Sequence, residues 1–166
     1  ERAVRTLESA EDDSGHAHAL VSLARVELLH GEAGQALQRL EAALSLAAAV
    51  RSAPVMASAH ALLGLIDARL GQHERSAARF RAAEELLGSG DALTLTRIDV
   101  LFLASLAARV RRDPAAGDRL VLDAERALVA VADGLPEDAR PAFLTGGTPA
   151  REIRAGAEAV RAARGR

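Results

Sequence analysis

The sequence predicts an all-α protein built from antiparallel helical hairpins. Apolar residues recur at spacings of three and four along nearly the whole chain, which is the pattern of amphipathic helices. The chain also repeats itself internally, which indicates a repeated structural unit. Hydrophobic residues make up 49% of the sequence but aromatic residues only 2%. A core of Leu, Val and Ala suits helices whose backbones approach closely, so composition agrees with the other two observations.

The internal repeat aligns residues 17–46 with residues 57–86, so that Gly31 recurs as Gly71. Several of the identities are alanines, which are common in this chain, so the signal depends mainly on the placement of Leu, Gly and Arg. The identical pairs are Ala17/Ala57, Ala19/Ala59, Leu23/Leu63, Gly31/Gly71, Arg39/Arg79, Ala42/Ala82, Ala43/Ala83 and Leu46/Leu86, with similar residues at Val26/Ile66 and Glu27/Asp67.

The first five helices are separated by small, acidic, glycine and proline residues. Helix 2–11 ends at the acidic cluster 11–15, in which Ser14 is the expected N-cap of the next helix. The second and fourth helices end before Gly31 and Gly71, as helices commonly do at glycine. The segment before Pro54 separates the third helix from the fourth. The five helices are expected at 2–11, 16–30, 33–49, 55–70 and 73–87.

The last four helices follow the same kind of signal. The segment 88–91 is rich in glycine and ends in Asp91, the expected cap of helix six. Asp113-Pro114 places a capping residue before a first-turn proline, which is a good start for helix seven. Pro136 and Thr148-Pro149 open the last two helices, and Gly146-Gly147 loosens the joint between them. These helices are expected at 92–111, 115–132, 136–144 and 149–163, and the short turns within pairs two–three, four–five and six–seven predict antiparallel hairpins.

Composition excludes several functional classes. The net charge of -2 and the isoelectric point near 6.2 offer no general attraction to nucleic acid or to an anionic membrane. All 21 basic residues are Arg, which we interpret as a GC-rich bacterial coding bias. The chain has no Cys, which excludes disulfides and thiolate chemistry but leaves the redox compartment undetermined. It has no apolar run of about 20 residues and no secretory signal pattern, and we expect a cytoplasmic location. It opens with Glu1, and we expect it to be part of a longer protein.

The residues around both glycines resemble the tetratricopeptide repeat family. That family places a large residue and Leu-Gly/Ala in its first helix, a Gly-acidic turn, and Ala, a large residue and Ala in its second helix. The matching residues are Leu20, Leu23-Ala24, Gly31-Glu32, Ala36, Leu40 and Ala43 in one unit, and His60, Leu63-Gly64, Gly71-Gln72, Ser76, Phe80 and Ala83 in the next. The match is good for 17–87 and weaker beyond, where Arg112-Asp113-Pro114 replaces the glycine turn and the register of the second helix drifts.

The resemblance implies a right-handed tetratricopeptide-like α-solenoid of about eight or nine helices. Its hairpin repeats are expected at about 14–50, 54–88 and 91–132 within residues 1–133, and C-terminal capping helices at 134–166. The usual period is about 34 residues, whereas here Gly31 and Gly71 are forty apart. The longer form resembles repeats of large bacterial signalling and transcription regulators. The tail 135–144, followed by Arg151-Glu152, is similar to segments that close such regions.

The resemblance further implies an inner groove lined by the first helix of each hairpin. The groove residues are expected to be Val21, Arg25, Leu28 and Leu29 from one unit, and Ala61, Leu65, Ala68 and Arg69 from the next. These positions are mostly apolar and lack the cluster of donors that grips a terminal carboxylate. They fit the apolar face of a partner helix or a second copy of the same protein. The alternative is that the leucines belong to the core and that the arginines are solvated or ion-paired.

Chemistry is not expected of this chain. His16 and His18 are two residues apart and point to different faces of a helix, so no metal site is predicted. Thr145-Gly146-Gly147-Thr148 lacks the lysine of a phosphate-binding loop and is interpreted as a hinge. We therefore predict a protein without catalytic residues or cofactor that serves as a protein-interaction or regulatory module. A domain that senses a small effector and a purely structural spacer are the alternatives.

Overall fold

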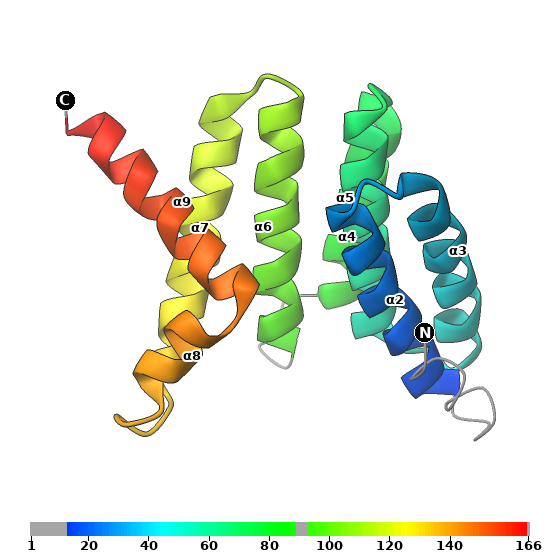
Figure 1. Cartoon of the computed structure of the whole chain (residues 1–166), viewed down its shortest axis with the longest axis horizontal. Coiled ribbons are helices and arrows are strands. Elements are labelled where there is room, and N and C mark those ends of the chain that lie inside the picture. Colours follow the sequence, from blue (N-terminus) through cyan, green and yellow to red (C-terminus); the bar gives the residue numbers. More distant parts are fainter. Residues whose placement is uncertain (1–12, 89–92, 166) are drawn as a thin grey trace. The chain divides into compact units, whose positions relative to one another are not determined.

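The computed structural model of the chain describes residues 13–88 and 93–165, and all of its regular structure is α-helical (Figure 1). Eight helices, α2 to α9, lie within these residues, which confirms the predicted all-α class. The chain divides into two compact units, unit 1 at 1–89 and unit 2 at 90–166. The predicted helix 2–11 and the predicted cap Asp91 lie outside the described residues.

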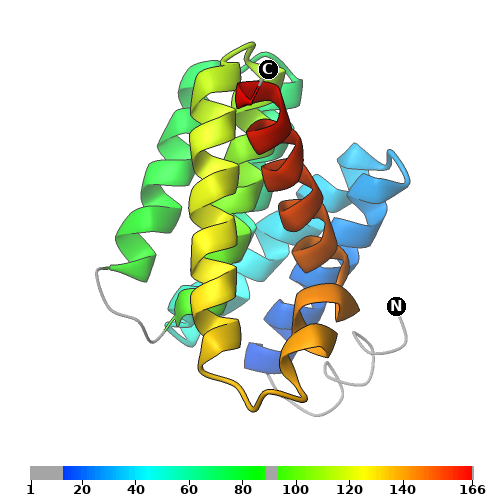
Figure 2. The ribbon, with the colours of Figure 1, turned by 90° about the vertical axis from the view of Figure 1, so that its left-hand side faces the viewer.

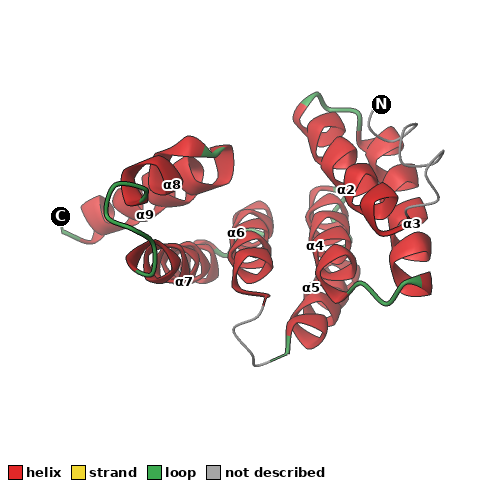
Figure 3. Cartoon of the chain, turned by 90° about the horizontal axis from the view of Figure 1, so that it is seen from below, coloured by secondary structure: helices red, strands yellow, loops and turns green. Residues whose placement is uncertain are grey.

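Unit 1 contains two helical hairpins, α2 (Asp13–Leu29) with α3 (Ala33–Ala49) and α4 (Ala53–Arg69) with α5 (His73–Leu87). The helices of each hairpin pack against each other along their length, and α4 also packs against α3 and α2 (Figure 3). Helix α4 is therefore covered on several sides, and every residue from position 61 to position 68 is buried. The predicted pairing of the helices in this unit is confirmed.

Unit 2 contains a third hairpin, α6 (Thr94–Val110) with α7 (Pro114–Asp133), followed by α8 (Arg140–Gly146) and α9 (Thr148–Arg164). Helix α9 packs mainly against α7, and the short α8 lies against both α7 and α9 (Figure 2). The side of α9 that faces the hairpin carries Ala150, Ile153, Ala157 and Val160, whose spacing of three and four places them on one face. Its other side is charged and exposed.

The turns of the first two hairpins have the same backbone structure. Gly31 has a φ of 81° and Gly71 a φ of 74°, the left-handed region that side chains other than glycine disfavour. At each turn the next amide N–H closes the helix by donating to a carbonyl five residues back, from Glu32 to Glu27 at 2.9 Å and from Gln72 to Asp67 at 2.8 Å. This is the Schellman arrangement, so the glycines act as the predicted helix terminators.

The third hairpin has the same turn without a glycine. Arg112 takes the left-handed conformation with a φ of 62°, and the Asp113 amide donates to the carbonyl of Ala108 at 3.0 Å. Asp113 caps α7 as predicted, because its side chain accepts a hydrogen bond from the amide of Ala116 at 3.0 Å. The helix terminates in the same way, so glycine marks this type of turn in the sequence but is not required for it.

The register of α7 follows that of α5 after an insertion of a single residue. Position 112 follows position 71 by 41 residues, whereas position 71 follows position 31 by forty. With this shift each buried residue of α3 and α5 has a buried counterpart in α7: Ala36, Ser76 and Gly117; Leu40, Phe80 and Val121; Ala43, Ala83 and Ala124; Ala47, Leu87 and Leu128. The apparent drift of register in the sequence is thus a uniform offset in the structure.

The repeated Arg and acidic positions form ion pairs at corresponding places, and the pair in the first hairpin is the closer one. The Arg39 Nε lies 2.5 Å from Glu27 Oε1, and the Arg79 Nε lies 3.9 Å from Asp67 Oδ2. Glu27 and Asp67 are buried, with 5% and 4% of their surface exposed. A buried carboxylate requires a partner, which explains why the Arg identity and the acidic similarity occur together in the repeat.

Two helices begin more than two residues away from their predicted starts. Helix α8 begins at Arg140 and not at Pro136, because Pro141 lacks an amide hydrogen and is tolerated only in the first turn. The Arg140 guanidinium also donates to the carbonyls of Leu135 and Asp133 at 3.0 and 3.1 Å, which holds the start of the helix to the end of α7. Helix α2 begins at Asp13, so Ser14 lies within its first turn and is not its N-cap.

Candidate functional site

The residues predicted to line a groove in unit 1 divide into a buried group and an accessible group. The buried group consists of Val21, Ala61, Leu65 and Ala68, none of which exposes more than 5% of its surface. The accessible group consists of Arg25 and Leu28, which are half-buried, and Leu29 and Arg69, which are exposed. Helices α2 and α4, which carry these residues, contact each other. The accessible group is therefore open to contact from outside unit 1, and the buried group contributes to packing.

Three large apolar side chains are exposed at the turn ends of the two hairpins. Leu29 ends α2 with 74% of its surface exposed, and Val26, one turn earlier on the same face, exposes 47%. Leu70, the residue after α4, exposes 64%. We call Val26, Leu29 and Leu70 the turn-end apolar set. Val26 and Leu70 were not among the predicted groove residues, because sequence spacing alone does not show which side of the last turn a neighbouring helix covers.

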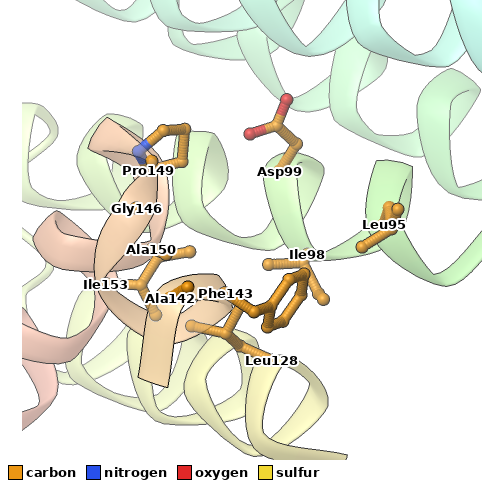
Figure 4. A pocket seen from close by; sticks show the side chains of 11 residues that line it. Leu95, Ile98, Asp99, Leu128, Ala142, Phe143, Gly146, Pro149, Ala150 and Ile153 are labelled. Carbon is orange, nitrogen blue, oxygen red and sulfur yellow. The ribbon is translucent and has the colours of Figure 1, made fainter. Parts of the chain in front are cut away.

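Unit 2 contains a cavity of about 440 Å³ that sequence reasoning did not predict (Figure 4). Its walls are mostly apolar, from Ile98, Leu128, Phe143, Ala150 and Ile153, and Asp99 adds a carboxyl group. These residues belong to the hydrophobic core cluster of the unit or pack against it. The cavity is therefore a concave extension of the core that opens to the surface, the general form of a small-molecule site in proteins.

Four helices place these residues. Helix α6 contributes Leu95, Ile98 and Asp99 from a single turn, and α7 contributes Leu128. Helix α8 contributes Ala142 and Phe143. The chain then passes through Gly146 and the extended Gly147, whose φ is -110° and ψ is 149°, directly into α9. The glycine pair, which the sequence indicated as a hinge, thus separates two helices at the edge of the cavity.

The wall formed by α9 is held firmly to α7. The Arg161 guanidinium donates two hydrogen bonds to Glu125, at 2.6 and 2.8 Å, in the bidentate arrangement that is strongest for this pair. This hydrogen bonding lowers the pKa of the Glu125 carboxyl and raises the pKa of Arg161, although desolvation opposes both shifts. In contrast, α8 has no buried residue, so it is the least firmly held wall of the cavity.

Metal-ligating and titratable side chains give no sign of a catalytic or metal site in the described residues. Within residues 13–88 and 93–165, no three His, Asp or Glu side chains lie close enough to hold a metal ion together. His60 is half-buried beside Arg79, whose guanidinium lies 3.4 Å from His60 Nδ1. Burial and the positive charge of Arg79 lower the pKa of His60.

Of the helices in the described part of the chain, none has the length and apolar character that crossing a membrane requires.

Comparisons with known proteins leave the site to be interpreted from its own geometry. A scan against protein-family models gives no match. Searches of curated proteins and of solved structures give no match either.

Proposed function

We propose that this chain is a non-catalytic protein-interaction module of the tetratricopeptide type, and that it belongs to a larger cytoplasmic bacterial signalling or transcription regulator. Three hairpins with the same turn geometry and corresponding buried positions support a repeat architecture of this kind. The resemblance of residues 17–87 to that family and the use of Arg for all 21 basic residues support the assignment to a bacterial regulator.

The turn-end apolar set is the observation on which the proposed interaction depends. Burial of apolar surface contributes roughly 25 cal/mol per Å², so a partner that covers these exposed side chains would gain binding free energy. Two adjacent hairpins each place such a leucine at the same end, Leu29 and Leu70. Exposed Arg69, next to Leu70, adds a charge that would orient an acidic or amphipathic partner.

The partner that fits this surface is the apolar face of a helix, either from another protein or from a second copy of this chain. A helix docks through apolar residues at spacings of three and four, and Val26 and Leu29 present one such pair to it. The buried residues Leu65 and Ala68 then support the surface from below without touching the partner.

Sedimentation equilibrium of the wild type and of Leu29→Asp tests the proposal. We expect association that increases with protein concentration in the wild type and is lost in the variant, while circular dichroism shows unchanged helicity. Val129→Asp, which changes an exposed apolar residue of α7 instead, should associate like the wild type. A wild type that stays monomeric at its highest soluble concentration would exclude a second copy of this chain as the partner.

A further inference from the structure

We infer that the cavity of unit 2 is a binding site for a small, uncharged, hydrophobic molecule. The site is separate from the turn-end apolar set of unit 1, so this inference does not depend on the proposed protein interaction. It depends on the size, the lining and the charge of the cavity (Figure 4).

The size of the cavity fits a small molecule. About 440 Å³ lies within the range of roughly 300–1,000 Å³ that is typical of ligand sites. The lining covers positions 95–99 of α6 and 149–153 of α9, which is little more than a turn of each helix. A docked helix would need a groove that continues over several turns, so a compact molecule fits this lining better.

The lining selects for hydrophobic character. Ile98, Leu128 and Ile153 are buried residues of the core cluster, and Phe143 packs against them with its ring at the cavity. An aromatic ring stacks or packs edge-on against other flat apolar groups, which favours an aromatic occupant. At the rim, Leu95 exposes 62% of its surface and would be covered by an occupant.

The charge at the rim selects against anions. Asp99 is the one ionisable residue in the lining, and its carboxyl lies at the edge of the cavity (Figure 4). The lining offers no cationic side chain to a negatively charged ligand, which would lose hydration in the cavity without gaining a partner of opposite charge. A neutral molecule avoids this cost.

The least firmly held wall provides a route of entry. Helix α8 has no buried residue and ends at Gly146, whereas α9 packs on α7 through its buried residues Ile153, Ala157 and Val160. Movement of α8 can therefore open the cavity without disturbing the hairpin below it. Phe143 would return with the helix and cover the bound molecule.

Two probes with one aromatic skeleton test the inference on the full chain. N-Phenylnaphthylamine is uncharged, and anilinonaphthalene sulfonate carries a sulfonate on the same rings. Both fluoresce in apolar surroundings. We expect saturable binding of the uncharged probe at one site per chain, and binding of the sulfonated probe weaker by about tenfold. The Asp99→Asn variant should reduce the difference between the probes.

A variant that fills the cavity shows where the probe binds. Ala142 lines the cavity yet is exposed, so the larger side chain of Ala142→Phe occupies space in the cavity without crowding the core. We expect this variant to bind the uncharged probe at least about tenfold more weakly. The control Ala159→Phe, at an exposed position of α9 outside the cavity, should bind like the wild type.

Circular dichroism must show the same helicity in all variants. Equal affinity of Ala142→Phe and wild type, or binding of several probes per chain without saturation, would overturn the inference. Equal affinity of the two probes for the wild type would overturn the part assigned to Asp99.

Discussion

The first and third hairpins have the same backbone plan but different residues at the positions that stabilise it. Helices α2 and α6 are both 17 residues long. In both hairpins the turn is closed by a hydrogen bond from an amide N–H to the carbonyl five residues earlier. The first hairpin has Gly31 in the left-handed position and the buried Glu27–Arg39 pair. The third has Arg112 in that position, and Ala108 stands where the first hairpin has Glu27.

This difference shows that the backbone hydrogen bonds define the turn and that side chains adjust its stability. An arginine in the left-handed region costs about 1–2 kcal/mol relative to an ordinary conformation. A buried ion pair is often no better than an apolar pair of similar volume. The third hairpin therefore has a less favourable turn residue and an apolar replacement for the ion pair, and it keeps the same geometry.

The largest effect is expected from breaking the ion pair of the first hairpin. Arg39→Leu leaves the Glu27 carboxylate buried without its partner, which should lower the free energy of unfolding by about 2–4 kcal/mol. Urea unfolding followed by circular dichroism measures this loss.

The third hairpin supplies the control for that variant. Leu120 and Ala108 occupy the positions of Arg39 and Glu27 there, so Glu27→Ala combined with Arg39→Leu copies its residues. The double variant should be more stable than Arg39→Leu alone. Equal stability of the single and double variants would mean that the carboxylate is not what makes the single change costly.

The next effect is expected at a close helix contact of the second hairpin. A Cβ atom added at Gly64 would lie 2.8 Å from the Phe80 ring. Gly64→Ala should therefore destabilise the protein by about 1–3 kcal/mol through overpacking, although alanine favours helix. Thermal or urea unfolding measures the change.

The first hairpin again indicates the compensating change. It pairs Ala24 with Leu40 where the second pairs Gly64 with Phe80. Gly64→Ala with Phe80→Leu should recover much of the loss. If Gly64→Ala by itself were as stable as the wild type, the Phe80 ring would have room to move. The close contact would then not explain why glycine occurs opposite Phe80.

A smaller effect is expected from exchanging the turn residues. Gly31→Arg should destabilise the protein by about 1 kcal/mol, and no other atom would lie within 4 Å of the new Cβ, so the cost belongs to the backbone. Arg112→Gly should stabilise it by about 0.5 kcal/mol, because the greater freedom of glycine in the unfolded chain offsets part of the gain. Changes of opposite sign in the free energy of urea unfolding of the two variants support this account, and changes of the same sign contradict it.

The smallest effect is a dependence of stability on pH that comes from His60. Burial and Arg79 lower its pKa in the folded protein, so the unfolded chain binds the proton more readily. Stability should be complete above the unfolded value of 6.5 and should fall as the pH drops through that value and then through the lower folded pKa. Unfolding measured at several pH values tests this.

His60→Leu should flatten this dependence, because leucine does not bind a proton. Leucine is the residue at the equivalent place in the first hairpin, Leu20. The Glu125 carboxyl, with its lowered pKa, also loses its contribution as the pH falls, but only below its unfolded value of 4.5. A variant with the same slope as the wild type just below pH 6.5 would exclude His60 as the source.

The sequence predicts the helices well because their ends depend on local residues. Gly31, Gly71 and Asp113-Pro114 terminate or cap helices through contacts within a few positions. The start of α8 was missed because two prolines compete for it, and Pro141 is the one that lies in the first turn.

The candidate sites were less predictable because exposure depends on which helix covers which face. Leu65 and Leu29 look alike in a helical pattern, yet one exposes 4% of its surface and the other 74%. The cavity of unit 2 joins residues from position 95 to position 153. No local spacing brings these together, because the packing of α8 and α9 on the third hairpin creates the site.

The position of Phe143 has a practical consequence for spectroscopy. The chain contains three Phe and neither Trp nor Tyr, so it has almost no absorbance or emission of its own in the near ultraviolet. Phe143 is the aromatic residue of α8 and lies at the cavity. Phe143→Trp would place a single indole there, and its emission would report the movement of α8 without background from any other residue.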